Sequence, residues 1–178
     1  QASCGSCWAF GTSEALADRF CIATKGAVAV NLSAQDVVSC ETQCYGCSGG
    51  YLDIAWEYFV SDGLVSSKCM PYTSGNGTVA DCPTSNTCTG SGTWKKYYAK
   101  NSALIDADDI QKEIYNNGPV SVAFDVYADF MTYQSGVYYH QTGSMEGGHC
   151  VEIVGWGHDE SSSLDYWIVK NSWNTSWG

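Results

Sequence analysis

The sequence predicts an α+β fold in which a helical first half is followed by a mainly β second half. Apolar residues recur at helical spacing in several segments up to about residue 60, whereas short runs rich in β-branched and aromatic residues begin near residue 120. Between these regions, residues 73–93 are rich in glycine, serine, threonine and asparagine, which is typical of a loop. We therefore expect two domains, residues 1–92 and 93–178, that share an interface.

Three helices are predicted in the first half. The segment 7–24 combines large apolar residues with good helix formers, which indicates a largely buried helix. A short helix is expected from Ser33, because Ser33 and Asp36 resemble a capping pair. A third helix should follow Gly50 and end near Gly63. Its apolar face would consist of Leu52, Ala55, Trp56, Phe59 and Val60.

The second half should contain one helix, near residues 108–116, and several short strands. The strands are predicted from runs of alternating or continuous apolar residues at 120–126, 136–139, 149–154 and 166–169.

The composition excludes several classes of protein. Hydrophobic residues make up 44% and aromatic residues 13% of the 178 positions, which argues against disorder. No apolar run is long enough to cross a bilayer, so no membrane association is expected. The 8 basic and 19 acidic residues give a net charge of -11, which opposes binding to phosphate backbones, so nucleic acid is not an expected partner.

Ten cysteines in a chain of this length indicate an oxidising compartment, where disulfides persist. Glycosylation sequons at Asn31, Asn76 and Asn174 agree with secretory export. No signal peptide is visible, and the chain opens on Gln1 and stops at Gly178, so we expect it to be truncated at both ends.

The strongest local motif is the run Cys-Gly-Ser-Cys-Trp at residues 4–8, at the start of the first predicted helix. A thiol at a helix N-terminus ionises more readily, because it lies at the positive end of the helix dipole. From the spacing alone, a pair of structural cysteines explains the run equally well. Together with Cys44 and Cys47, it also imitates a four-cysteine zinc site or a redox motif.

This run is similar to the active-site signature of the papain family of cysteine proteases. Three further segments match the family in the same order: Cys47-Ser48-Gly49-Gly50, then Gly147-Gly148-His149 with residues 154–157, and finally residues 170–173 with Trp177-Gly178. Within the family the pattern resembles cathepsin B at residues 18–22 and 126–149, and cathepsin C at residues 164–173.

The resemblance implies a papain-like fold with a helical left domain, an antiparallel barrel-like right domain and a cleft between them. It also implies that Cys7 is the nucleophile and His149 its base, and that Asn171 orients the histidine. Gln1 and the backbone N–H of Cys7 would stabilise the oxyanion. No metal or cofactor is expected.

The chain has three histidines, and chemistry alone gives each an equal claim to be the base. We expect His140 and His158 at the surface, His158 in a polar turn, whereas His149 begins a buried strand. Taken alone, Asn171 is weak support, because asparagine followed by serine is common in turns.

Further residues are expected to contact the substrate. Gly49 and Gly50 would allow its backbone to lie close to the enzyme, although they would also suit a simple turn. By resemblance, the pocket for the substrate residue second from the scissile bond is lined by Leu52, Ala123 and Cys150. Trp173 should cover the contact between Asn171 and His149 on the leaving-group side, or serve as an ordinary core tryptophan.

The resemblance also implies three disulfides, which are Cys4–Cys47, Cys40–Cys82 and Cys69–Cys88. In cathepsin B relatives, the position of Cys21 pairs with an upstream cysteine. Cys44 and Cys150 have no partner that the resemblance identifies.

Cathepsin B holds the C-terminal carboxylate of its substrate with histidines in a long loop, but the segment between Tyr72 and Tyr97 contains no histidine. We therefore expect an endopeptidase. A cathepsin C-like dipeptidyl aminopeptidase is one alternative, and a non-catalytic relative is another. Expected partners are polypeptide substrates and cystatin-like or pro-segment inhibitors of a monomer that is lysosomal, vacuolar or secreted.

Overall fold

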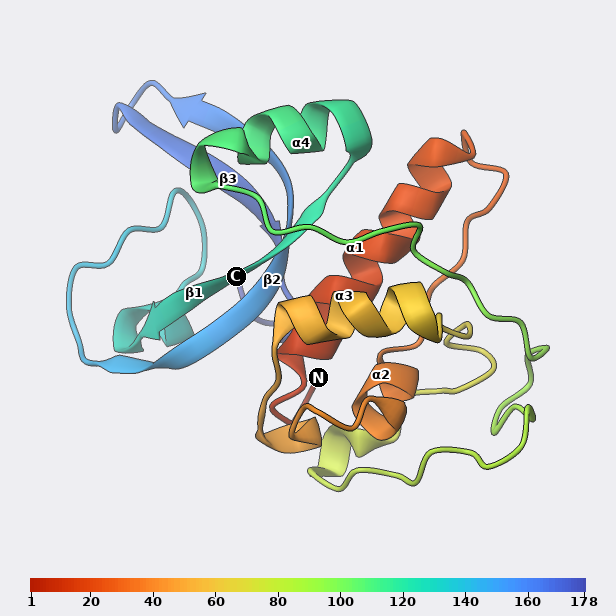
Figure 1. Ribbon diagram of the computed structural model, residues 1–178. Coiled ribbons are helices and arrows are strands. Elements are labelled where there is room, and N and C mark those ends of the chain that lie inside the picture. The colour runs from red at the N-terminus through yellow and green to blue at the C-terminus, as the bar shows by residue number, and fades with distance from the viewer.

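The computed structural model describes residues 1–178, and its elements are grouped around one central helix. Helix α1 (Cys7–Ala23) lies between two helices on one side and a sheet on the other (Figure 1). The helices are α2 (Ala34–Cys40) and α3 (Leu52–Ser61), and α4 (Ile110–Asn117) packs on the sheet side. The strands are β1 (Val120–Tyr127), β2 (Met145–Asp159) and β3 (Leu164–Lys170).

The central position of α1 explains why its sequence lacks a polar face. Both sides of the helix are covered, so small and hydroxyl residues are buried along it as well as large apolar ones. The buried hydroxyl group of Thr12 donates to the carbonyl oxygen of Trp8 at 2.6 Å, which satisfies it within the helix. The helices predicted for residues 7–24, for the segment after Ser33 and for the segment after Gly50 are all confirmed.

The main hydrophobic core lies between α1, α2 and α3. It includes Trp8, Leu16, Val37, Phe59 and Leu64, each at most 5% exposed. Burial of each large side chain contributes about 1.5–3 kcal/mol relative to exposure. Because Trp8 adjoins Cys7, this core also fixes the start of α1.

The expected capping pair at α2 is only half correct. The Ser33 hydroxyl accepts from the backbone N–H of Asp36 at 3.0 Å, as a cap should. The Asp36 side chain, however, is fully buried and accepts from the Val65 N–H at 2.8 Å, the Tyr58 hydroxyl at 2.9 Å and the Lys96 ammonium at 2.8 Å. It thus joins α2 to α3 and to the extended segment near residue 96.

The second half contains an antiparallel sheet of order β1-β2-β3, open within these residues. Phe124 pairs with His149, and Glu152 pairs with Lys170. The strand expected at 136–139 is wrong, since this segment has no strand partner. There the Tyr138 hydroxyl donates to Asp129, and its ring packs edge-on against Phe130 instead.

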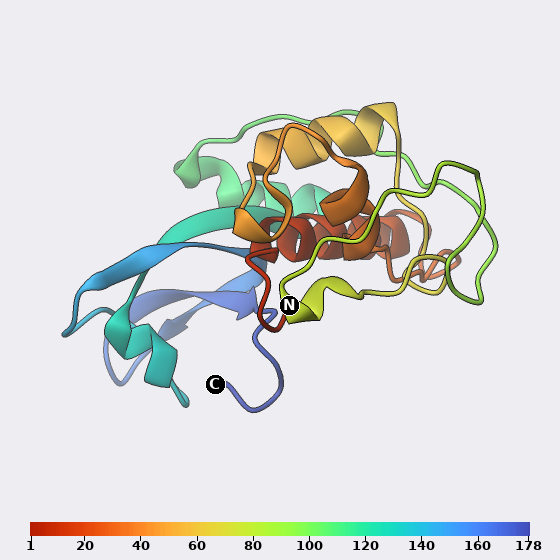
Figure 2. The same cartoon turned by 90° about the horizontal axis from the view of Figure 1, so that it is seen from below.

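The loop of residues 77–106 runs around the outside of the helical group before it reaches α4 (Figure 2). Disulfides Cys40–Cys82 and Cys69–Cys88 fasten it, and Cys4–Cys47 joins the start of α1 to the neighbouring turn. These are the three pairs that the resemblance implied. Among the helices, none combines the length and apolar character that crossing a bilayer requires.

The division at residue 92 remains a prediction, and nearby contacts bear on where it should fall. Tyr97 forms an isolated bridge with Leu64, and the Ala99 N–H donates to the carbonyl oxygen of Phe59 at 2.9 Å. The segment through Ala99 therefore packs with the helices.

Candidate active site

Cys7 is the first residue of α1, is half-buried and forms no disulfide. The residues before it are held tightly, because the Gly5 N–H donates to the carbonyl oxygen of Cys47 at 2.8 Å beside the Cys4–Cys47 disulfide. No side chain caps this end of α1. Cys7 therefore lies at the positive end of the helix dipole, where no capping side chain intervenes.

His149 and Asn171 form the polar pair that the resemblance implied. His149 lies on β2 and is 5% exposed, and its Nε2 is 2.7 Å from the Oδ1 of Asn171. The same oxygen accepts from the Ser172 backbone N–H at 2.8 Å, which identifies it as the carbonyl end of the amide. The histidine must therefore donate through Nε2, and in the neutral ring Nδ1 is left as the base.

Burial lowers the pKa of His149 below its ordinary value, while the hydrogen bond to Asn171 opposes this shift. A buried imidazole favours the neutral form unless an anion lies beside it.

Aromatic rings shield the pair from water. The ring centroids of His149 and Trp173 are 4.5 Å apart. Phe124, on β1, packs edge-on against His149 with a centroid distance of 5.8 Å. Trp173 in turn contacts Phe130 and Trp177. This is the position expected for a tryptophan covering Asn171 and His149.

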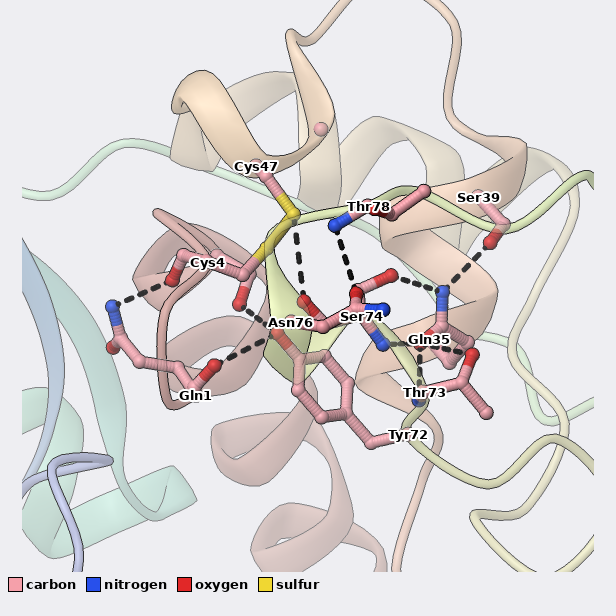
Figure 3. The surroundings of a disulfide bond; sticks show 12 residues. Gln1, Cys4, Gln35, Ser39, Cys47, Tyr72, Thr73, Ser74, Asn76 and Thr78 are labelled. Atoms are coloured by element: carbon pink, nitrogen blue, oxygen red, sulfur yellow. Dashed lines mark hydrogen bonds between the residues drawn. A yellow bond between two sulfur atoms is a disulfide. The ribbon is translucent and has the colours of Figure 1, made fainter.

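Gln1 is held in place by residues of both halves. Its Oε1 accepts from the Ser172 hydroxyl at 2.6 Å, and its Nε2 donates to the carbonyl oxygen of Cys4 at 3.2 Å. The Tyr72 hydroxyl donates to its backbone oxygen at 3.1 Å (Figure 3). The side-chain amide therefore lies beside the segment that leads to Cys7. Sequence reasoning missed Ser172 and Tyr72, because serine and tyrosine occur widely as ordinary polar residues.

Helix α1, which carries Cys7, packs directly on strand β2, which carries His149. A methyl group added at Gly11 would lie only 2.7 Å from the sulfur of Cys150 and 3.1 Å from the backbone carbon of Val151. Helix and strand thus approach more closely than any other residue at this position would allow. Cys7 stands one helical turn before this contact, and His149 directly precedes Cys150.

The two glycines expected to contact substrate differ in their surroundings. A Cβ at Gly49 would meet nothing within 4 Å, and its φ of 115° favours glycine. A Cβ at Gly50 would lie 2.4 Å from the Trp8 ring. Gly49 is therefore open to a ligand, whereas the missing side chain at Gly50 makes room for the tryptophan.

A cavity of about 730 Å³ lies between α1, α3, α4 and β1. Of the three residues predicted to line a substrate pocket, Leu52 and Ala123 line this cavity, whereas Cys150 is buried and is the cross-strand partner of Ala123. The sequence did not point to two further lining residues, Trp56 and Arg19. Helical spacing had indicated only that Trp56 packs in a core.

A second, open hollow of about 1160 Å³ is bordered by residues from both ends of the chain. Asn171, Trp173 and Gln1 line it, together with Trp177 and Tyr133.

The remaining candidate residues lie elsewhere. The His140 ring stacks on Tyr127, and His158 contacts Asp165 at 2.7 Å, both on the surface. His158 is within β2, so the turn expected there is wrong. The zinc interpretation fails because Cys4 and Cys47 are bonded to each other.

Comparison with known proteins agrees with this arrangement. Residues 1–178 match the family described as papain family cysteine protease. The chain is 43% identical over 208 residues to cathepsin B-like cysteine proteinase 4 of Caenorhabditis elegans, covering 100% of this chain and 62% of that protein. It is 42% identical over 182 residues to cathepsin B-like CP3 of Giardia intestinalis, covering 100% and 60%.

Among solved structures, proCathepsin B from Trypanosoma congolense matches with a TM-score of 0.85 and 37% identity, over 100% of this chain and 61% of that one. The chain thus spans about three fifths of the length of these relatives. The likeness extends over all of the elements described above, and the fold is papain-like. The match along its whole length shows that this chain belongs to the papain family of cysteine proteases.

Proposed function

We propose that the protein is a cysteine-type endopeptidase in which Cys7, His149, Asn171 and Gln1 carry the chemistry. One observation supports this most directly. The Asn171 carbonyl fixes His149 Nε2 as a donor at 2.7 Å, leaving Nδ1 as a base in the wall that packs against the helix beginning at Cys7.

In the proposed reaction, the Cys7 thiolate attacks the carbonyl carbon of the scissile peptide bond, and His149 carries the proton that the thiol has lost. Collapse of the tetrahedral intermediate breaks the carbon–nitrogen bond, and His149 gives its proton to the departing amine. Water then attacks the thioester, His149 takes a proton from it, and the carboxylic acid leaves with the thiolate restored.

The oxyanion would be stabilised by the backbone N–H of Cys7 and the amide of Gln1. The Gln1 Nε2 carries two hydrogens and uses one for the carbonyl oxygen of Cys4, so the other is available. Removal of one such donor typically lowers the rate about 10²- to 10³-fold.

The substrate would lie across Gly49, with the side chain second from the scissile bond in the cavity of Leu52 and Ala123. The lining of that cavity favours an apolar side chain. The departing part of the substrate would occupy the hollow beside Trp173. Cleavage within the chain is favoured over removal of C-terminal dipeptides, because residues 73–96 contain no histidine to hold a terminal carboxylate.

Labelling at pH 5.5 tests the proposal. An epoxide that alkylates activated cysteine should modify Cys7 in the wild-type protein and nothing in Cys7→Ala. The matched control is Cys44→Ala, which removes another half-buried free cysteine and should label normally, because burial raises the pKa of Cys44 to about 12. A folded protein that takes up no epoxide would contradict the proposal.

Peptides with free or blocked ends separate the endopeptidase from a dipeptidyl aminopeptidase. An endopeptidase should cleave a substrate whose N-terminus is acetylated, whereas an aminopeptidase requires the free amine.

We further propose that the natural protein is a monomer that is lysosomal, vacuolar or secreted, and that a pro-segment or cystatin-like inhibitors keep it inactive. The proenzyme name of the related trypanosome structure supports the pro-segment.

A further inference from the structure

A cluster of four charged side chains lies in the interface between α1 and the β2–β3 pair. The Lys170 Nζ is 3.2 Å from an oxygen of Glu152, 3.4 Å from Asp18 and 3.6 Å from Glu14. Three carboxyl groups from two elements thus surround one ammonium group. Nothing in the proposed reaction uses these residues.

Glu152 is the unusual member of the cluster. It is 0% exposed, and neither of its carboxyl oxygens receives a hydrogen bond. Burial raises its pKa to about 7, although the Lys170 charge opposes the shift, and burial also raises the pKa of Glu14. Leaving such a group ionised without the lysine would be strongly unfavourable.

The cluster belongs to the same interface that carries the candidate site. Cys7, Gly11, Glu14 and Asp18 recur at intervals of four, three and four residues, which places them on one face of α1. That face packs on β2, as the Gly11 contacts with Cys150 and Val151 show. One stripe of the helix therefore holds the nucleophile at its start and the charges two to three turns later.

The strands repeat this arrangement. Glu152 lies two residues beyond Cys150, on the same face of β2, and pairs directly with Lys170 on β3. His149 is three residues before Glu152, and Asn171 follows Lys170 without an intervening residue. A displacement of this strand pair relative to α1 would move His149 and Asn171 relative to Cys7.

We propose that Lys170 is a positioning residue, which holds the β2–β3 pair against α1 and thereby sets the separation of His149 and Asn171 from Cys7. The inference rests on the proposed function, because it assigns Lys170 to the same reaction. The lysine contacts neither substrate nor reacting atoms. On one side it forms ion pairs with the carboxylates of Glu14 and Asp18 on α1. On the other side it is bonded directly to Asn171 in the sequence, so its position constrains that of Asn171.

The test compares two substitutions of Lys170 in the mature protein at pH 5.5. Lys170→Met keeps the length of the side chain and removes its charge, and should lower kcat by about 10- to 100-fold with little change in KM. Lys170→Arg keeps the charge and should retain most of the activity. Rates are divided by the concentration of sites that an irreversible thiol-directed inhibitor titrates, so that loss of folded protein does not count.

The matched control is Lys112→Met. Lys112 forms an ion pair with Asp109 at 3.7 Å, but both side chains are well exposed, so its loss should leave kcat unchanged. Equal kcat values for wild type, Lys170→Met and Lys112→Met would overturn the inference. A wild-type protein without labelling at Cys7 would instead contradict the proposed function.

Glu152→Gln provides a second test that does not depend on Lys170→Met folding. The charged or titratable groups that face Glu152 are Lys170 on β3 and Glu14 and Asp18 on α1, whereas its partner on β1 is Ser121. As the pH rises through about 7, Glu152 ionises, the cluster gains negative charge and kcat of the wild type should fall. Glu152→Gln should remove this fall between pH 6 and 8. Superimposable pH profiles of kcat would overturn the inference.

Discussion

Asn171 orients His149 with a neutral amide, and this choice has a physical consequence. A carboxylate in the same place would stabilise the protonated imidazole by itself, whereas the amide fixes the ring without adding charge. Burial is then the largest influence on the pKa of His149, and it favours the neutral ring. In the proposed mechanism, the anion that a protonated His149 needs beside it would have to come from another residue, and Asn171 cannot supply it.

Substitution of Asn171 should therefore affect rate more than binding. In Asn171→Ala the His149 ring loses its acceptor and rotates, so we expect kcat to fall about 10²-fold while KM changes little. Steady-state kinetics on a blocked peptide measures both. Asn116→Ala is the control, because Asn116 is an exposed residue of α4 that bonds only to the Lys112 backbone. Equal activity of Asn171→Ala and Asn116→Ala would remove Asn171 from the proposed site.

The ordered motifs predicted which residues should form the site. They did not predict the structural role of every residue in them. His149 and Asn171 meet as the resemblance implied, although they are 22 positions apart. Gly50 belongs to the same motif as Gly49, yet in the structure its missing side chain leaves the space that the Trp8 ring occupies. Contact with an indole ring 42 residues earlier leaves no local pattern, so the sequence did not distinguish the two glycines.

Among the elements, the contact of α1 with β2 depends on Gly11. An alanine there would bring its Cβ to 2.7 Å from the Cys150 sulfur, so helix and strand must separate. We expect Gly11→Ala to destabilise the protein by about 1–3 kcal/mol, although alanine is the better helix former by about 1 kcal/mol. Urea unfolding monitored by tryptophan fluorescence measures the change.

The double variant identifies the cause of that destabilisation. Cys150→Ala removes the sulfur, so Gly11→Ala should cost less in that background than in the wild type. Additive effects of the two substitutions would show that the clash with Cys150 is not responsible.

Most helices and strands were predictable from the sequence, because burial against a core or a neighbouring strand leaves a pattern of apolar residues. The helices begin and end close to the expected positions, and β1 and β3 lie where apolar runs indicated. The failed strand at 136–139 has strand-like residues, but no neighbouring strand supplies hydrogen bonds, and Asp129 organises the segment instead. Pairing partners are a long-range property that residue preference does not reveal.

For the molecule as a whole, the buried carboxyl groups predict greater stability in acid than at neutral pH. The pKa of Glu152 and Glu14 is raised on folding, so the folded protein binds more protons than the unfolded chain between about pH 4.5 and 7. The stability that these two glutamates contribute therefore falls as the pH rises through this window, whereas the lowered pKa of His149 acts in the opposite direction. Asp129 and Glu113 behave in the opposite way, because their pKa values are lowered in the folded protein. The stability that they contribute is lost as the pH falls below the ordinary pKa range of these groups.

Thermal unfolding between pH 3 and 8 checks this prediction. The melting temperature should be highest near pH 4 to 5 and should decrease toward pH 7. In Glu152→Gln the decrease should be smaller, with a melting temperature at pH 7 about 5 °C above that of the wild type. Equal melting temperatures of the wild type and Glu152→Gln at pH 7 would contradict the direction assigned to Glu152.

The hydrogen bond between Gln1 and Ser172 joins residues 171 positions apart, and this has a consequence for synthesis on the ribosome. Helices α1 to α3 and their core form from the first hundred residues and can collapse as soon as these leave the exit tunnel. The segment from Asn171 to Trp173 is synthesised later than these helices, and closing so long a loop is slow. A nascent chain would therefore carry an ordered helix α1, with Cys7 at its start, before the pair of His149 and Asn171 can form.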